Sequence, residues 1–281
     1  MPVSVESFEL HDRPCIRLRR GEASAEVSLH GAQVLSWKPA PTRERLYLSP
    51  ASRHAAGTAI RGGIPVIFPQ FAGRGPLAKH GFARLRDWEF LGLGAGVAGE
   101  EVALFELSDD ATTRASWPHA FRARLEVALL PGALQVGLDI LNRGDAPFAF
   151  TVALHTYLRV GRLPDVDVRG LESTGYEDTA RAGAAMPPAG APVRFDGEVD
   201  RIYADTPRSL VLQEPERALH VEAEGFRDTI VWNPGATLAA SIGDLGAGEH
   251  LRFVCVESGS VLQPVMLAPG ERWLGIQRLR E

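Results

Sequence analysis

One histidine and one glutamate stand in settings that suit acid/base chemistry. In residues 148–158 the even positions are large and apolar apart from Thr156, whereas the odd positions are mostly small and end in His155 and Tyr157. Such a face leaves room for a ligand, although a core histidine bonded to a neighbouring hydroxyl is the alternative. Glu257 follows the apolar run 251–256. It is either exposed at a strand end or partly buried with a raised pKa, which would suit a general base.

A second feature is a basic segment that contains no carboxylate. Between Glu44 and Asp87 the chain has seven basic residues and no acidic one. The basic residues are Arg45, Arg53, Arg61, Arg74, Lys79, Arg84 and Arg86. The apolar stretch 61–71 includes two glycines that would let the backbone approach a ligand. Arginines on such a frame suit bidentate capture of a phosphate or carboxylate, and a solvated basic face is the alternative.

Other chemistries find no support in the sequence. The eight histidines include no pair at close metal-ligand spacing, so we expect no metal site. Neither a GxSxG elbow nor a GxxxxGK[ST] loop occurs. The GAGVAG string at 94–99 matches the dinucleotide-binding pattern, but the alternation after it predicts a strand where that pattern needs a helix. We therefore interpret 94–99 as a hairpin loop.

The composition limits the class of protein further. The 281 residues carry a net charge of −5, which disfavours binding to nucleic acid or an anionic membrane. No apolar run approaches the roughly 20 residues of a membrane span. Two cysteines, Cys15 and Cys255, and a start without a basic or apolar leader predict a reduced, cytoplasmic protein. We expect a monomer with one domain over residues 1–281 and a small-molecule partner.

Hydrophobic periodicity predicts an all-β protein. Apolar and polar residues alternate in 121–129 and 134–140, and with 148–154 and the intervening turns they predict a three-strand antiparallel meander. Only 109–116 suits a short helix, with Asp109 or Asp110 as N-cap, and 180–193 has the composition of a long loop. Further strands are expected at 25–29, 35–38, 87–93, 102–107, 219–223, 229–232, 251–256 and 261–267. Together these elements predict a large antiparallel β-sandwich.

Six short motifs resemble, in order, those of the glucose-6-phosphate 1-epimerases, the hexose-6-phosphate mutarotases of the aldose 1-epimerase superfamily. They are LHGAQVLSW (29–37), IRGGIPVIFP (60–69), HGFAR (80–84), LHTYL (154–158), DTIVWNP (228–234) and VE (256–257). The resemblance implies a galactose mutarotase-like β-supersandwich that interconverts the α and β anomers of a hexose 6-phosphate. Since that reaction moves protons and one C–O bond without net redox change, no cofactor is expected.

The resemblance also implies roles for individual residues. His155 corresponds to the family's general acid and Glu257 to its general base. In the free enzyme the acid would hold a proton and the base would lack one. Arg61 and Arg84 are expected to hold the sugar phosphate, and Asp200 is expected to contact a sugar hydroxyl.

Two positions leave alternatives open. Many members of the family have glutamine where this chain has Lys79, and an ammonium group lacks the acceptor of an amide. We include Lys79 among the substrate-binding residues, with its part in hydroxyl recognition open. Arg86 either joins the phosphate pocket or pairs with Asp87.

The competing functions are a mutarotase for unphosphorylated aldoses and a non-catalytic sugar-phosphate-binding or regulatory protein on the same fold.

Overall fold

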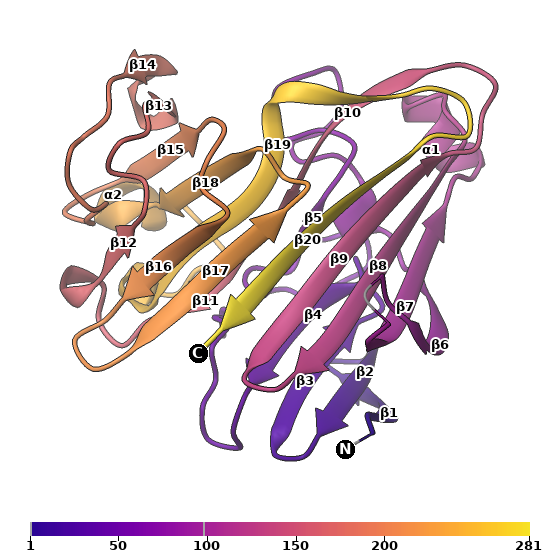
Figure 1. Cartoon of the computed structure of the whole chain (residues 1–281), viewed down its shortest axis with the longest axis horizontal. Coiled ribbons are helices and arrows are strands. Elements are labelled where there is room, and N and C mark those ends of the chain that lie inside the picture. Colours follow the sequence, from indigo (N-terminus) through magenta and orange to yellow (C-terminus); the bar gives the residue numbers. More distant parts are fainter. Residues whose placement is uncertain (1, 98) are drawn as a thin grey trace.

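The computed structural model describes residues 2–97 and 99–281. Met1, at the start considered above, and Ala98, in the glycine pattern, lie outside the described residues. The described strands form three sheets in which every pairing between named strands is antiparallel (Figure 1). The prediction of a large antiparallel β fold is therefore confirmed. No described helix is long and apolar enough to cross a membrane.

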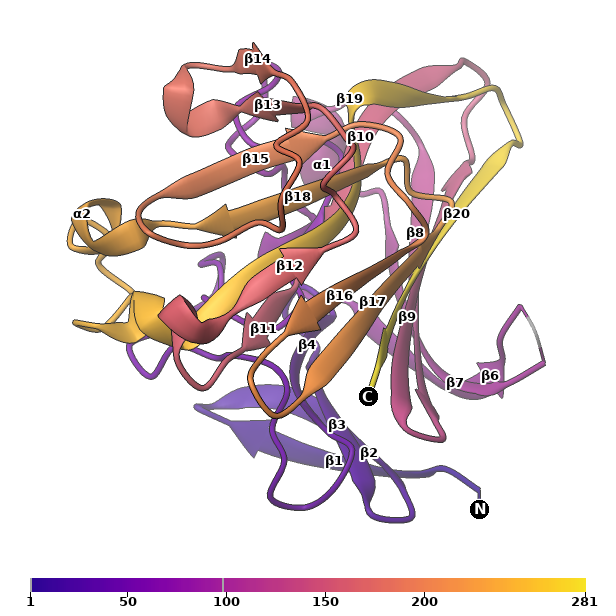
Figure 2. The ribbon, with the colours of Figure 1, turned by 60° about the vertical axis from the view of Figure 1, so that its left-hand side comes forward.

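The first sheet is built from the N-terminal part of the chain and lies at one end of the molecule (Figures 1 and 2). Its strands follow one another in order: β1 (Ser4–Leu10), β2 (Arg13–Arg20), β3 (Ala23–Ser28) and β4 (Gln33–Lys38). The predicted strands at 25–29 and 35–38 correspond to β3 and β4. β1 and β2 are not among the predicted strands, because charged residues interrupt the apolar ones there.

The second sheet draws its strands from distant parts of the chain. Its order is β14 (Ala184–Met186), β13 (Tyr176–Asp178), β15 (Val199–Tyr203), β18 (Asp228–Asn233), β19 (Phe253–Leu267), β10 (Phe148–Leu154) and β5 (Val66–Ile67), and β11 (Tyr157–Arg159) also pairs with β19. This arrangement brings residues near positions 66, 155, 200, 230 and 257 into one sheet.

The third sheet packs against the second to form the sandwich (Figure 2). Its order is β12 (Asp167–Arg169), β16 (Ser209–Gln213), β17 (Ala218–Glu224), β20 (Arg272–Arg280), β9 (Ala133–Asn142), β8 (Phe121–Leu130), β7 (Glu101–Ser108) and β6 (Glu89–Ala95). The core between the layers includes Leu125 and Leu138 from the third sheet and Val152 and Leu154 from the second. The even positions of β10 therefore face the core, as expected.

The predicted three-strand meander is wrong at its third strand. β8 and β9 pair over ten residues each, but β10 crosses into the second sheet, between β19 and β5. The free edge of β9 is occupied by β20, which comes from the end of the chain. The Asn142 amide fixes the crossover by donating to the carbonyls of Ala146 and Leu267. A turn signal predicts a reversal, but it does not determine which strand becomes the neighbour.

The predicted strands at 251–256 and 261–267 are parts of one strand, β19, which begins at Phe253. Its register against β10 shifts, so that Val152 pairs with Ser260 and Phe150 with Val265. The buried Asp228 carboxylate accepts hydrogen bonds from the backbone N–H groups of Val261 and Leu262 at this irregularity. Because the strand continues past Glu257, that residue lies inside the sheet and not at an exposed end.

The short elements agree largely with expectation. α1 (Ala111–Ser116) is capped by Asp110, whose carboxylate accepts from the Thr113 N–H. β6, which includes Gly94 and Ala95 of the glycine pattern, pairs with β7 as a hairpin, and the described residues after the pattern form a strand where a dinucleotide site needs a helix. The 180–193 segment is wrong as an uninterrupted loop, since it contains β14. The remaining helices are α2 (Gly235–Ala239) and the 3-10 turns Ala83–Leu85, Leu163–Asp165, Thr179–Arg181 and Glu249–Arg252. Both cysteines are free and buried.

The two glycines after Arg61 serve the chain's own backbone. A Cβ on Gly62 would lie 2.3 Å from the Tyr47 carbonyl oxygen, and one on Gly63 would lie 2.2 Å from that of Val34. Both residues have positive φ, at 115° and 61°. The packing therefore contradicts the expectation that these glycines make room for a ligand. They let the segment after Arg61 lie directly against the stretch around Tyr47 and against β4.

We predict that Gly63→Ala destabilises the protein far more than Gly132→Ala. The two positions share a positive φ, at 61° and 68°, but Gly132 has no neighbouring atom within 4 Å of an added Cβ. The φ penalty alone costs about 1–2 kcal/mol at Gly132, whereas the added overlap raises the cost at Gly63 to roughly 2–5 kcal/mol. Urea denaturation of both variants measures the difference. Equal losses would contradict the close backbone approach.

Candidate active site

Five of the six predicted site residues line one pocket of about 440 Å³ on the second sheet: Arg61, Lys79, His155, Asp200 and Glu257. Strand register explains part of this convergence. Asp200 on β15 pairs with Trp232 on β18, and Ile230 on β18 pairs with Glu257 on β19. Directly paired residues, and residues two apart on a strand, share a face of the sheet, so these four side chains point the same way.

His155 reaches the pocket through a break between strands. β10 ends at Leu154, and the chain resumes as β11 at Tyr157. The His155 N–H donates to the Pro65 carbonyl at 3.0 Å, and the Tyr157 N–H donates to the Gly63 carbonyl at 2.9 Å. The segment that follows Arg61 therefore holds the backbone of the histidine in place.

The imidazole and the carboxylate meet at the base of the pocket. Nδ1 of His155 lies 3.4 Å from Oε1 of Glu257, and the two side chains are 9% and 1% exposed. Neither Nδ1 nor Oε2 of Glu257 has a hydrogen-bond partner among the described residues. Glu257 is thus more deeply buried than the sequence suggested, and no hydroxyl holds Nδ1 as it would in an ordinary core histidine.

Burial perturbs both groups in opposite directions. It lowers the pKa of His155 well below its usual value, with further lowering by the nearby His80, Arg84 and Arg61. It also raises the pKa of Glu257 well above its usual value, and the Asp200 carboxylate adds to that rise while Lys79 opposes it. Burial therefore favours the neutral form of each group, whereas the expected protonation states are the charged forms.

Aromatic rings enclose the imidazole. The Tyr157 ring stacks on His155 with centroids 4.8 Å apart and planes 8° apart, and Trp232 meets both rings edge-on. His80 approaches from another side, with its centroid 5.6 Å from that of His155. Tyr157, Trp232 and His80 all lie in the motifs quoted above, but their residue types alone assign them no place beside the catalytic candidates.

The basic side chains near the pocket are held in different ways. Arg61 donates from Nε to Asp244 and from Nη1 to the Tyr157 hydroxyl, each at 3.1 Å. Arg84 is not among the lining residues, but its Nη2 donates to the Lys79 carbonyl and its buried Nε has no partner among the described residues. Asp244 was missed, because a lone aspartate in a glycine-rich loop has no sequence signal.

Other cations of the basic segment are already paired. Arg86 pairs with Asp110, and Asp87 pairs with His30, so the alternative in which Arg86 pairs with Asp87 is wrong. Arg86 is also not among the residues that line the pocket. Arg74 lines the pocket but pairs with Glu177.

Asp200, which also lines the pocket, has a pKa raised to about 6, mainly by burial. A half-buried carboxyl group that faces the cavity suits a contact with a hydroxyl group.

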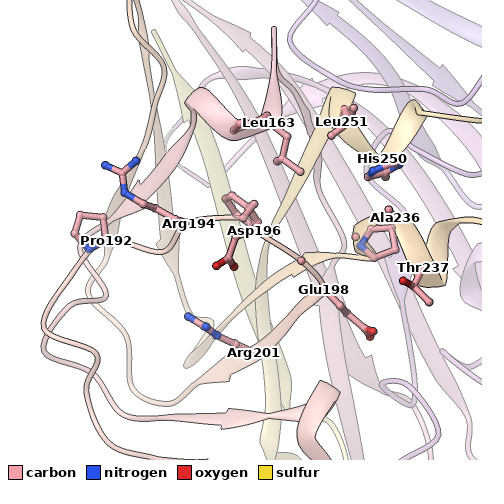
Figure 3. A pocket seen from close by; sticks show the side chains of 15 residues that line it. Leu163, Pro192, Arg194, Asp196, Glu198, Arg201, Ala236, Thr237, His250 and Leu251 are labelled. Carbon is pink, nitrogen blue, oxygen red and sulfur yellow. The ribbon is translucent and has the colours of Figure 1, made fainter.

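A larger cavity of about 940 Å³ lies elsewhere in the fold (Figure 3). Figure 3 shows Arg194, Asp196 and Glu198 spread around it, with Arg201, and none of the six predicted residues lines it. Arg201 and Asp200 are adjacent on β15 and point to opposite faces. The described residues also include no group of three or more His, Cys, Asp or Glu side chains that could hold a metal ion.

Comparison with known proteins identifies the family of this chain. A family model described as aldose 1-epimerase matches residues 14–280. The chain belongs to the aldose 1-epimerase family. A Cenchrus ciliaris protein named "putative glucose-6-phosphate 1-epimerase" is 36% identical over 263 residues, which cover 89% of this chain and 79% of that protein. An Escherichia coli protein of the same name is 34% identical over 246 residues, which cover 84% of this chain and 80% of that protein.

Solved structures place this aldose 1-epimerase family member in the expected fold. The crystal structure of a candidate mutarotase from Salmonella typhimurium superposes with a TM-score of 0.87 at 28% identity, over 98% of this chain and 92% of that one. A galactose mutarotase-like protein from Clostridium acetobutylicum has a TM-score of 0.76 at 15% identity, over 99% of this chain and 98% of that one, which supports the fold alone. The predicted mutarotase-like β-sandwich is confirmed.

We predict that Glu257→Gln stabilises this family member at alkaline pH. Burial raises the pKa of Glu257 above its unfolded value of 4.5. The wild-type protein therefore loses stability as the pH rises from about 4.5 through the folded pKa, whereas a glutamine does not ionise. At pH 8 we expect the free energy of unfolding of Glu257→Gln to exceed that of the wild type by about 1–3 kcal/mol, which is the cost of an uncompensated buried polar group. At pH 4.5 we expect little difference between the two proteins.

Urea denaturation at both pH values measures this effect, with Glu216→Gln as the control. Glu216 is exposed, so its replacement removes a carboxylate without changing the buried pair. A Glu257→Gln variant with the same stability as the wild type at pH 8 would show that the carboxylate is well solvated in the folded protein.

Proposed function

We propose that the pocket interconverts the α and β anomers of a hexose 6-phosphate, with glucose 6-phosphate as the representative substrate. The observation that carries the proposal is the contact between a buried imidazole and a buried carboxylate beside a cluster of cations. The names of the plant and bacterial relatives point to the same substrate. A binding protein has no need of such an acid/base pair, which disfavours the non-catalytic alternative.

In this mechanism Glu257 and His155 exchange protons with the sugar in opposite senses. The Glu257 carboxylate takes the proton of the anomeric hydroxyl, and the His155 imidazolium gives a proton to the ring oxygen as the C1–O5 bond breaks. Because Nδ1 is buried and faces Glu257, Nε2 is the ring nitrogen that meets the sugar. Rotation about C1–C2 and reclosure, with both transfers reversed, give the other anomer and restore the starting protonation.

The remaining site residues would bind the substrate. Arg61 and Arg84 provide guanidinium donors for the phosphate, and Lys79 adds a third positive charge on the pocket wall. Asp200 would accept from a sugar hydroxyl. The chemistry moves protons and one C–O bond, so no cofactor is required.

The proposal extends to the setting in which the enzyme works. We propose one catalytic domain over residues 1–281, a monomer, and a cytoplasmic location without nucleic-acid or membrane partners. The net charge of −5 supports the absence of a polyanionic partner. Within the basic segment, Arg86 and Arg74 pair with carboxylates, while Arg61 and Lys79 line the pocket, so these cations form no free basic surface.

Replacing either member of the pair is expected to remove most of the rate acceleration. A positioned acid or base contributes about 10²–10⁴-fold, so His155→Ala and Glu257→Gln should each lower kcat by that factor. Exchange NMR of the anomeric protons of glucose 6-phosphate measures the rate. His250→Ala, in the larger cavity, is the control and should keep wild-type exchange. Near-normal exchange in either catalytic variant would overturn the assignment.

Phosphate recognition is tested by comparing two substrates. A charge-assisted hydrogen bond contributes about 1.5–3 kcal/mol, so Arg61→Ala should lower kcat/KM for glucose 6-phosphate by about 10–100-fold. Free glucose, which has no phosphate, should lose far less. Arg86→Ala is the matched control, since Arg86 pairs with Asp110 and does not line the pocket. Equal losses on both sugars would instead favour an aldose mutarotase without phosphate specificity.

A further inference from the structure

The charges around the catalytic pair are arranged unevenly. His155 contacts a different element on each side. Its contacts are Glu257 on β19, Tyr157 on β11, Trp232 on β18 and His80. The charges of Arg84 and Arg61 lie near enough to lower its pKa. Glu257 is influenced instead by Asp200 and Lys79. Arg61 is linked to the imidazole side of the pair through Tyr157, whose hydroxyl it contacts and whose ring stacks on His155.

The two arginines near His155 differ in how many partners they have within the protein. Arg61 is tied to Asp244 and to the Tyr157 hydroxyl, and the ring of that tyrosine lies flat on His155. Arg84 keeps a buried Nε without a partner among the described residues. A buried guanidinium donor that lacks an acceptor is costly unless a ligand supplies one. Arg61 therefore has a counter-charge in Asp244, whereas a bound anion would supply the acceptor that Nε of Arg84 lacks.

We propose that the phosphate of the substrate activates the acid/base pair in addition to holding the sugar. When the dianion binds Arg61 and Arg84, the proton shared by the pair moves from Oε1 of Glu257 to Nδ1 of His155. The number of protons on the pair is unchanged. The move creates both the imidazolium that protonates the ring oxygen and the carboxylate that acts as the base. This inference rests on the proposed function.

The electrostatics of the site agree with this switch. Burial lowers the pKa of His155 and raises that of Glu257, so the resting pair holds its proton on the carboxyl group. His80 is itself neutral at physiological pH, because burial lowers its pKa to about 2. Arg84 and Arg61 are therefore the permanent cations that oppose a charge on His155. A phosphate bound to them removes that opposition on the imidazole side of the pair.

Because of this switch, the enzyme would distinguish phosphorylated from unphosphorylated sugars by the rate of the chemical step as well as by binding. A free aldose can occupy the pocket, but it leaves the pair in its resting protonation state. Discrimination between glucose 6-phosphate and glucose should then appear in kcat as well as in KM, since the phosphate contributes to the chemical step.

NMR of the histidine side chains in the wild-type protein tests the protonation change directly. The probes are 1,5-anhydroglucitol 6-phosphate, a closed-ring sugar that lacks the anomeric hydroxyl, and unphosphorylated 1,5-anhydroglucitol. We expect the ¹⁵N shifts of His155 at pH 7 to report a neutral ring in the free protein and with the neutral sugar, and an imidazolium with the phosphorylated one. A ring that is charged without ligand, or neutral with the phosphorylated ligand bound, would overturn the proposal.

A variant separates activation from simple binding. Arg84→Gln removes one cation that opposes the charged imidazole, so it should raise kcat for free glucose about tenfold while lowering kcat/KM for glucose 6-phosphate. If Arg84 only bound phosphate, activity on free glucose would not rise. Arg86→Gln, two residues away and outside the pocket, is the matched control and should change neither rate.

A two-part substrate keeps the test independent of the folding of that variant. Xylose lacks the sixth carbon and its phosphate, and phosphite dianion can supply the missing charge. We expect saturating phosphite to accelerate xylose anomerisation by the wild-type enzyme at least tenfold. Phosphite that inhibits turnover of glucose 6-phosphate by competition, yet leaves xylose turnover unchanged, would contradict the switch.

The two proposals can fail separately. If the enzyme does not accelerate anomer exchange of glucose 6-phosphate, the proposed function is wrong, and the NMR measurement does not depend on turnover. If exchange is fast but His155 stays neutral in the phosphorylated complex, only the activation by phosphate is wrong.

Discussion

The site depends on one costly interaction, the burial of an imidazole and a carboxylate against each other. Water would stabilise a charge on either group, but His155 and Glu257 are almost completely enclosed. A single proton shared between two such groups satisfies the pair at the lowest cost, because it avoids both an isolated buried anion and an isolated buried cation. The same burial makes the position of that proton sensitive to nearby charge, since electrostatic interactions are stronger away from water.

The backbone around the pair explains why this arrangement persists. Gly62 and Gly63 let their segment lie against neighbouring carbonyls, and the carbonyls of Gly63 and Pro65 then hold the chain at Tyr157 and His155. On the other side, Glu257 lies within the long strand β19, where Asp228 satisfies backbone amides at a register shift. Both members of the pair are thus fixed by hydrogen bonds of the backbone. Neither relies on a flexible loop.

Local sequence patterns predicted most individual strands but not their neighbours. Alternation identified β8, β9 and β10, because it depends only on side chains two residues apart. The placement of β10 in the second sheet depends on β20, more than a hundred residues later, and no local signal reports that pairing. The motifs likewise singled out His155 and Glu257. The burial that lowers the pKa of His155 and raises that of Glu257 is a property of the assembled sandwich, and so is the contact of Asp244 with Arg61.

Tertiary pairing also decides which cations of the basic segment remain available to a substrate. The sequence offers seven between Glu44 and Asp87 without a preference among them. The fold neutralises Arg86 with Asp110 and Arg74 with Glu177, and it buries Arg45 beside Glu281. Arg84 is left with an unsatisfied donor, and no carboxylate among the described residues forms an ion pair with Lys79. An acidic protein can therefore have cations in its pocket, because its carboxylates form ion pairs with some cations of the segment and not with others. Arg84 and Lys79 lie where they influence His155 and Glu257, respectively, whereas Arg53 is exposed elsewhere on the surface.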